Sequence, residues 1–136
     1  MWQWYAVSAM VCFATMQLVF AHLTRRGMSP AAILLVVFGV AAVFYAGHVR
    51  LTRTQLPLST SALLMLVTAA ALSFAGNLFS LRAMAAAPNP GYASAISGVH
   101  ALVVTVCSIF IFGIAVSWPK LCGVVLCVLG VALLVI

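Results

Sequence analysis

Long apolar stretches, separated by short polar segments, recur along the whole of this chain. A helix needs about 20 predominantly apolar residues to cross a hydrocarbon core of about 30 Å. Five stretches reach or approach that length and are predicted to span the membrane, namely residues 4–23, 31–49, 62–86, 92–113 and 121–136. All five prolines fall in the connectors between these stretches or in their first turns, where proline does not disrupt a helix. The pattern predicts an all-α integral membrane protein, a bundle of five transmembrane helices.

Composition supports this prediction and indicates that the bundle is surrounded by lipid. Hydrophobic residues make up 67% of the 136 residues and charged residues 4%, and the mean hydropathy is +1.32. A protein of this composition would expose a large apolar surface and aggregate in water, so its partner is the lipid bilayer. We expect one transmembrane domain over residues 1–136.

The chain has no Asp or Glu, and its six basic residues lie singly or in pairs near the ends of the apolar stretches. We expect these basic side chains to contact anionic lipid headgroups. Nucleic-acid binding is not expected, because it needs a clustered basic face. With five spans, Arg50, Arg53 and Lys120 fall on one side of the membrane and Arg25, Arg26 and Arg82 on the other. Because positive loop charges set orientation, this balance predicts dual topology.

The absence of carboxylates also limits the possible chemistry. Paired-acid hydrolysis, a Ser-His-Asp triad and carboxylate-held metals all need Asp or Glu, and no glycine-rich phosphate loop occurs. The four cysteines lie inside apolar stretches without a CxxC spacing, and we interpret them as small apolar packing residues. We therefore expect that the chain is not an enzyme and that it has neither a cofactor nor a metal site.

Small residues recur at steps of four and three along the third and fourth predicted helices, the spacing of one helix face. In a membrane such faces allow two backbones to approach closely. The first face consists of Ala69, Ser73, Gly76, Ser80 and Ala83, and the second of Ser94, Gly98, Ala101, Thr105 and Ser108. These two helices are predicted to form the packed centre of the protein.

Three polar residues of these two helices are candidate substrate-binding residues. Arg82 could meet an anionic or polar group of a substrate, or its side chain could extend to the headgroups. Asn77, deeper in the third helix, could contact substrate or hydrogen-bond a neighbouring helix. His100, near the middle of the fourth, is a candidate proton carrier or a neutral packing residue.

Gly123, Cys127 and Gly130 form a shorter small-residue stripe on the last predicted helix. Steps of four and three place them on one face of that helix. The stripe is predicted to be either a dimer interface or a packing surface within one chain.

The chain resembles a single EamA-like half of the drug/metabolite transporter superfamily. Most of the likeness lies in the second half of the sequence, in NLFSLRAM (77–84), NPGYA (89–93), FIFG (110–113), KLCGVVL (120–126) and LGV (129–131). The spacing of Gly123 and Gly130 also resembles the glycine pair that forms the dimer in the small multidrug resistance family. The resemblance implies a five-helix repeat in the bacterial inner (plasma) membrane.

The resemblance further implies a function. Full-length members hold two such repeats in inverted orientation and transport small metabolites, so this chain is predicted to act as an antiparallel homodimer or with a second half-transporter. The glutamate that follows the position of Gly113 in many repeats is here Ile114, and the first helix has Phe13 and Ala14 where small multidrug resistance transporters have a glutamate. These departures argue against proton-coupled export of cationic drugs, and Arg82 suits a neutral, anionic or lipid-linked substrate better. The alternative is a non-transporting membrane partner subunit of a larger complex.

Overall fold

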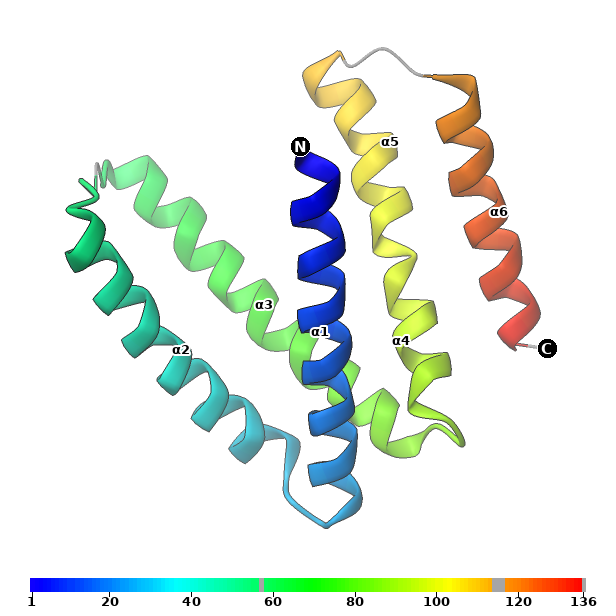
Figure 1. The fold of residues 1–136 in the computed structure, drawn as a ribbon, viewed down its shortest axis with the longest axis horizontal. Helices are drawn as coiled ribbons and strands as arrows, with labels where there is room; N and C mark the ends of the chain where they lie inside the picture. The colour runs from blue at the N-terminus through cyan, green and yellow to red at the C-terminus, as the bar shows by residue number, and fades with distance from the viewer. Residues whose placement is uncertain (57, 114–116, 136) are drawn as a thin grey trace. The chain divides into compact units, whose positions relative to one another are not determined.

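The computed structural model describes residues 1–56, 58–113 and 117–135 and shows an all-helical chain. Ile114 and the last residue of the fifth predicted span, Ile136, lie outside the described residues. The helices are α1 (Trp2–Arg25), α2 (Pro30–Thr52), α3 (Thr60–Ala86), α4 (Pro90–Gly98), α5 (His100–Phe112) and α6 (Trp118–Val135) (Figure 1). The predicted fold class, an all-α membrane protein, is confirmed.

Within the described ranges, four segments are long and apolar enough to cross a membrane by length and composition. They are α1, α2, α3 and the segment Pro90–Phe112, which contains α4 and α5. Leu121–Leu133, within α6, is a shorter apolar helix. The chain divides into two compact units, Met1–Ala86 and Ala87–Ile136, which are described separately below. The single domain predicted over residues 1–136 stays a prediction.

In the first unit α1, α2 and α3 run alternately up and down, and both α1 and α2 contact α3. Gly27, two residues after the end of α1, adopts a left-handed backbone conformation (φ 87°), which glycine accepts without steric cost. Ser29 then caps α2, because its Oγ accepts a hydrogen bond from the Ala32 amide at 3.3 Å, and Pro30 occupies the first helical turn. A tight turn between α1 and α2 follows from these residues.

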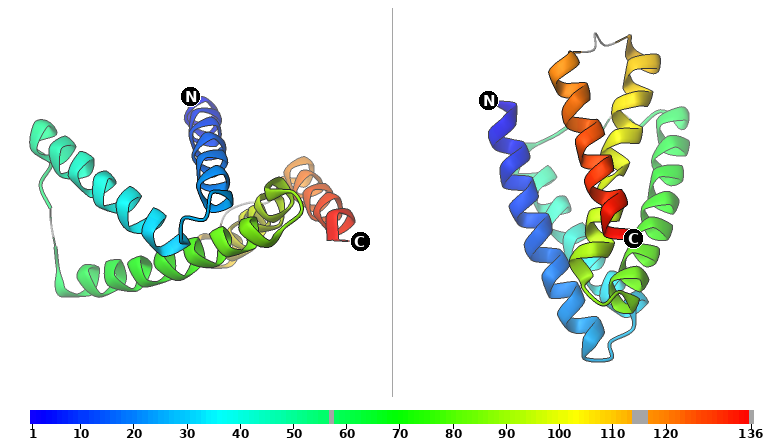
Figure 2. Two further views of the ribbon diagram at one scale, coloured as in Figure 1. Left: turned by 90° about the horizontal axis from the view of Figure 1, so that it is seen from below. Right: turned by 90° about the vertical axis from the view of Figure 1, so that its right-hand side faces the viewer.

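The buried side chains of this unit gather at the end that carries the α1–α2 turn. They come from the end of α1, the start of α2 and the end of α3: Phe20, Ala21, Ile33, Leu34, Leu81 and Met84. Away from this end the three helices spread apart, as the two views in Figure 2 show together with Figure 1. The end with the turn therefore carries most of the packing within the unit.

Ile33→Ala is expected to destabilise the protein by about 2 kcal/mol, the lower end of the usual range for removing a large buried aliphatic side chain. Ile33 is 2% exposed, so its removal leaves a cavity. The destabilisation is at the low end because exposed apolar side chains of a membrane protein meet lipid and not water. The variant therefore loses mainly dispersion contacts. SDS titration followed by tryptophan fluorescence measures the change. Leu35→Ala is the control, since Leu35 is 76% exposed; an equal loss in both variants would contradict this account of the core.

In the second unit the fourth predicted span, residues 92–113, is interrupted. α4 begins after Asn89, whose Oδ1 accepts a hydrogen bond from the Gly91 amide at 2.9 Å, and α4 ends at Gly98. Val99 separates it from α5, and the Val99 amide donates to the Ile96 carbonyl at 3.2 Å, a three-residue step instead of four. α6 contacts α4. The span is therefore two helices in sequence, and not one.

The interruption has local causes in the sequence. The Ser97 hydroxyl donates to the Ala93 carbonyl one turn earlier, at 2.9 Å, a bond that bends helices. Gly98 follows directly, and Gly/Ser pairs are a common position of helix kinks. No proline lies between residues 91 and 112. The break is therefore explained by the Ser97-Gly98 pair and by His100, whose ring contacts the Ser97 carbonyl.

Candidate functional site

Asn77 lies on the inner face of α3. It is half-buried, four residues after Ser73 and four before the buried Leu81, and residues four apart share a helix face. Its Nδ2 donates to the Ser73 carbonyl at 2.8 Å and lies 3.2 Å from the Ser73 Oγ. Because the Ser73 carbonyl only accepts, the amide nitrogen has to face it. The amide of Asn77 is therefore oriented by its own helix.

Arg82 is exposed and lies four residues before the end of α3, about 6 Å from that end by the rise of an α-helix. It directly follows Leu81, which is 1% exposed. The five-residue step from Asn77 corresponds to about 140° around the helix. The structure does not bring Asn77 and Arg82 onto one face of α3, so a ligand that meets both has to use the long side chain of Arg82.

A groove of about 620 Å³ lies between α2 and α3 in the first unit. Ser73 is the polar residue among the side chains that line it, which are those of Ala31, Leu34, Leu35, Phe38, Gly39, Ala70, Ser73 and Phe74. Small-molecule sites are typically apolar with a few placed polar groups. The bond between Ser73 and Asn77 therefore places a polar pair at the edge of an apolar groove.

His100 is the first residue of α5 and directly follows the break at Val99. Its Nδ1 lies 2.7 Å from the carbonyl oxygen of Ser97. The imidazole is exposed, and the bond holds it against the backbone of the interrupted segment. The structure thus places the candidate proton carrier at the irregular point of the fourth span.

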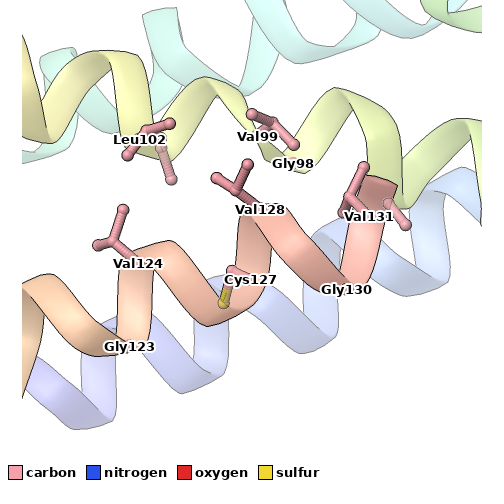
Figure 3. Close-up of a pocket in the computed structure, with 11 residues that line it drawn as sticks. Gly98, Val99, Leu102, Gly123, Val124, Cys127, Val128, Gly130 and Val131 are labelled. Carbon is pink, nitrogen blue, oxygen red and sulfur yellow. The ribbon is translucent and has the colours of Figure 1, made fainter. Parts of the chain in front are cut away.

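A second groove, of about 640 Å³, lies within the second unit between α4–α5 and α6 (Figure 3). Val124, Val128 and Val131 of α6 point towards α4 and α5, where Val99 and Leu102 face them. Its apolar lining is formed by Ala95, Gly98, Val99, Ala101, Leu102, Gly123, Val124, Cys127, Val128, Gly130 and Val131. The predicted stripe of α6 therefore lines the edge of this groove.

The stripe itself has open space beside it. A Cβ atom added at Gly123 or Gly130 would meet no heavy atom within 4 Å in the described chain. In Figure 3 the sulfur of Cys127 points away from α5. The stripe is consequently not in tight contact with the described part of its own chain.

The candidate residues divide between the two units. Asn77 and Arg82 belong to the first, and His100 belongs to the second together with the stripe Gly123, Cys127 and Gly130. Among the described residues, no group of three or more His, Cys, Asp or Glu could hold a metal ion. Whether these residues bind substrate or a second chain stays a prediction.

Two features of the site were missed by the sequence reasoning. The first is the bond that orients Asn77 towards Ser73, which the four-residue spacing could have indicated. The second is the break before His100, for which the Ser97-Gly98 pair is a signal. Both are local to one helix segment and follow from side chains that compete for backbone carbonyls.

Comparison with known proteins gives one match. The family model described as the EamA-like transporter family matches residues 1–136. None of the curated proteins and none of the solved structures compared with the chain matches it.

Proposed function

The chain belongs to the EamA-like transporter family, and from this premise we propose that it carries a small metabolite or a lipid-linked small molecule as a dimer of inverted copies. The family match covers the whole chain and is the observation that carries the proposal. Members of the family are membrane transporters of the drug/metabolite type and not enzymes. The protein is accordingly an integral membrane protein whose surroundings are the lipid bilayer, and we propose the bacterial inner membrane as its location.

The inverted dimer is supported by the family resemblance and by the stripe on α6. The family model matches residues 1–136, and the resemblance implies that a transport unit holds two inverted repeats. Secondary transporters of this type bind substrate near the midplane, between the repeats. Gly123 and Gly130 leave room for a second backbone, and small faces are where membrane helices approach most closely. We propose that a second copy docks there in the opposite orientation.

The substrate class is supported by the polar groups of α3 and α5. Arg82 supplies a positive charge near one end of α3, while Asn77 and His100 supply neutral polar groups deeper in the spans. The sequence contains no carboxylate that would attract an organic cation. A neutral, anionic or lipid-linked molecule fits these groups.

Reconstitution of the purified chain tests the function. Liposomes that contain the chain and no other protein are incubated with a mixture of small bacterial metabolites, and the compounds that enter are identified by mass spectrometry. At least one compound should accumulate above the level in protein-free liposomes. Uptake that occurs only when a second membrane protein is reconstituted with the chain would contradict the homodimer and favour the partner-subunit alternative.

Dual topology gives a separate prediction. Fusions of the C-terminus to alkaline phosphatase and to green fluorescent protein should both be active in one cell population, because the loop charges balance. Removing two charges from one side, with Arg50→Gln and Arg53→Gln together, should shift the population towards one orientation. A C-terminus found on one side only in the unmodified chain would contradict dual topology.

A further inference from the structure

We propose that Nε2 of His100 binds a proton during transport and that this proton crosses together with an anionic substrate. This inference rests on the proposed function and names its coupling ion and the charge of its substrate. His100 lies ten residues after the start of the apolar segment Pro90–Phe112, about 15 Å along it by the helical rise. That depth is close to the middle of a hydrocarbon core of about 30 Å.

The hydrogen bond at the break determines which ring nitrogen is available. The Ser97 carbonyl oxygen, 2.7 Å from Nδ1, accepts hydrogen bonds and cannot donate one. Nδ1 therefore carries the proton in the neutral imidazole, and Nε2 carries the lone pair. Nε2 is therefore the atom of the ring that can take a second proton.

Protonation acts on the bond that holds the break. A charged donor makes a shorter and stronger hydrogen bond than a neutral one, so the imidazolium holds the Ser97 carbonyl more firmly than the neutral ring does. That carbonyl belongs to the last turn of α4, and His100 begins α5. The proton thus strengthens a contact between two helices of one span, at the point where the backbone ladder is interrupted.

No acidic side chain is available to balance the charge of the imidazolium. The other titratable side chains of the second unit are Tyr92 on α4, Cys107 on α5, and Cys122 and Cys127 on α6, with Lys120 in the first turn of α6. None of these side chains is a carboxylate, since the sequence has no Asp or Glu. A second copy of the chain supplies none either.

A substrate anion can provide the missing charge. An unpaired cation inside a bilayer is costly, so the anion favours protonation of His100. By linkage the proton favours binding of the anion by the same factor. The proton carried by His100 and a singly charged anion enter and leave together, and because their charges sum to zero the loaded site is neutral and has the lowest cost in an apolar region. The lack of acidic residues therefore favours symport of an anion with a proton.

Nitrogen NMR of the chain in liposomes tests the proton site directly. The chain has three histidines, so spectra of ¹⁵N-histidine protein can be assigned with His100→Gln. When the pH is lowered, the His100 signals should change from those of the Nδ1-protonated neutral ring to those of a doubly protonated ring. An Nε2-protonated neutral ring, or a ring that stays neutral as the pH falls, would overturn the proposal.

Proton uptake tests the pairing with an anion. Liposomes that contain the chain and an internal pH-sensitive dye receive inorganic phosphate or gluconate from outside, with choline as the cationic probe. At least one anion should acidify the interior, and more strongly at lower external pH, because the proton is a co-substrate. His100→Gln should reduce the acidification to the level of protein-free liposomes, while His48→Gln, a variant near the end of α2, should keep it. Acidification by neither anion, or equal acidification by the His100→Gln variant, would overturn the inference.

Different results would contradict the proton–anion pairing at His100 and the proposed transport function. Uptake of a neutral or cationic compound in the metabolite screen, without proton uptake in the presence of either anion, overturns the proton–anion pairing and leaves the transport function intact. An Nδ1-protonated His100 that takes up its second proton, in a chain that transports nothing, contradicts the transport function and supports the proton site.

Discussion

Leucine at Gly123 or at Gly130 is expected to convert the proposed dimer into monomer in detergent, with a dissociation constant raised about tenfold or more, equivalent to about 1.4 kcal/mol. The two glycines lie seven residues apart, about 10 Å along α6, with Cys127 between them on the same face. A leucine side chain there would separate two facing backbones and remove the dispersion contacts on which association in lipid depends. The monomer should tolerate the change, because a Cβ atom at either glycine meets nothing within 4 Å. Size-exclusion chromatography with light scattering measures the shift, and circular dichroism should show unchanged helix content.

Gly47→Leu is the matched control for the glycine variants. Gly47 lies on α2 and also has open space beside its Cα, but it is not part of the stripe, so this variant should stay dimeric. If Gly123→Leu and Gly130→Leu both stay dimeric as well, the stripe packs within one chain. The pairing surface would then lie on the small-residue faces of α3 or of α4–α5.

Arg82→Gln is expected to lower transport about tenfold to a hundredfold, because a hydrogen bond to a charged group contributes about 1.5–3 kcal/mol. The chain should still accumulate and purify, since Arg82 is exposed and its replacement leaves no cavity. Uptake into liposomes of whichever compound the metabolite screen identifies measures the effect, at equal amounts of reconstituted protein.

Arg82→Lys separates a substrate contact from an anchoring role. Lysine keeps the positive charge, and therefore the charge balance of the loops, but loses the planar, forked set of donors of arginine. We expect it to retain a substantial part of the transport that the glutamine variant loses. Normal transport by both variants would show that the side chain only reaches the headgroups.

The fold class follows from the sequence because apolar length is a signal that needs no tertiary context. The start of α2 was also readable, since Ser29 and Pro30 are typical of a helix N-terminus. The break at Val99 was not predicted, because the apolar run from 92 to 113 continues through it without a proline. It depends on the Ser97 hydroxyl and the His100 ring, which each bond to a backbone carbonyl.

The candidate site was predictable as a set of residues but not as a geometry. Asn77 and Arg82 are conspicuous in an apolar helix, whereas the direction of the Asn77 amide is set by Ser73. The open space beside Gly123 and Gly130 depends on how α6 sits against α4 within its unit, which the spacing of the stripe does not specify. Residue type therefore identified the polar groups, and contacts between side chain and backbone determined what each one faces.

Two tandem fusions of the chain test the inverted dimer most directly. In the predicted arrangement of five spans the two ends of a copy lie on opposite sides of the membrane, so direct fusion of the C-terminus of one copy to the N-terminus of another inverts the second copy. A fusion with one additional transmembrane helix between the copies holds them parallel. Uptake into liposomes should be retained by the direct fusion and lost by the fusion with the additional helix. Uptake by the parallel fusion alone would contradict transport by inverted copies of this chain.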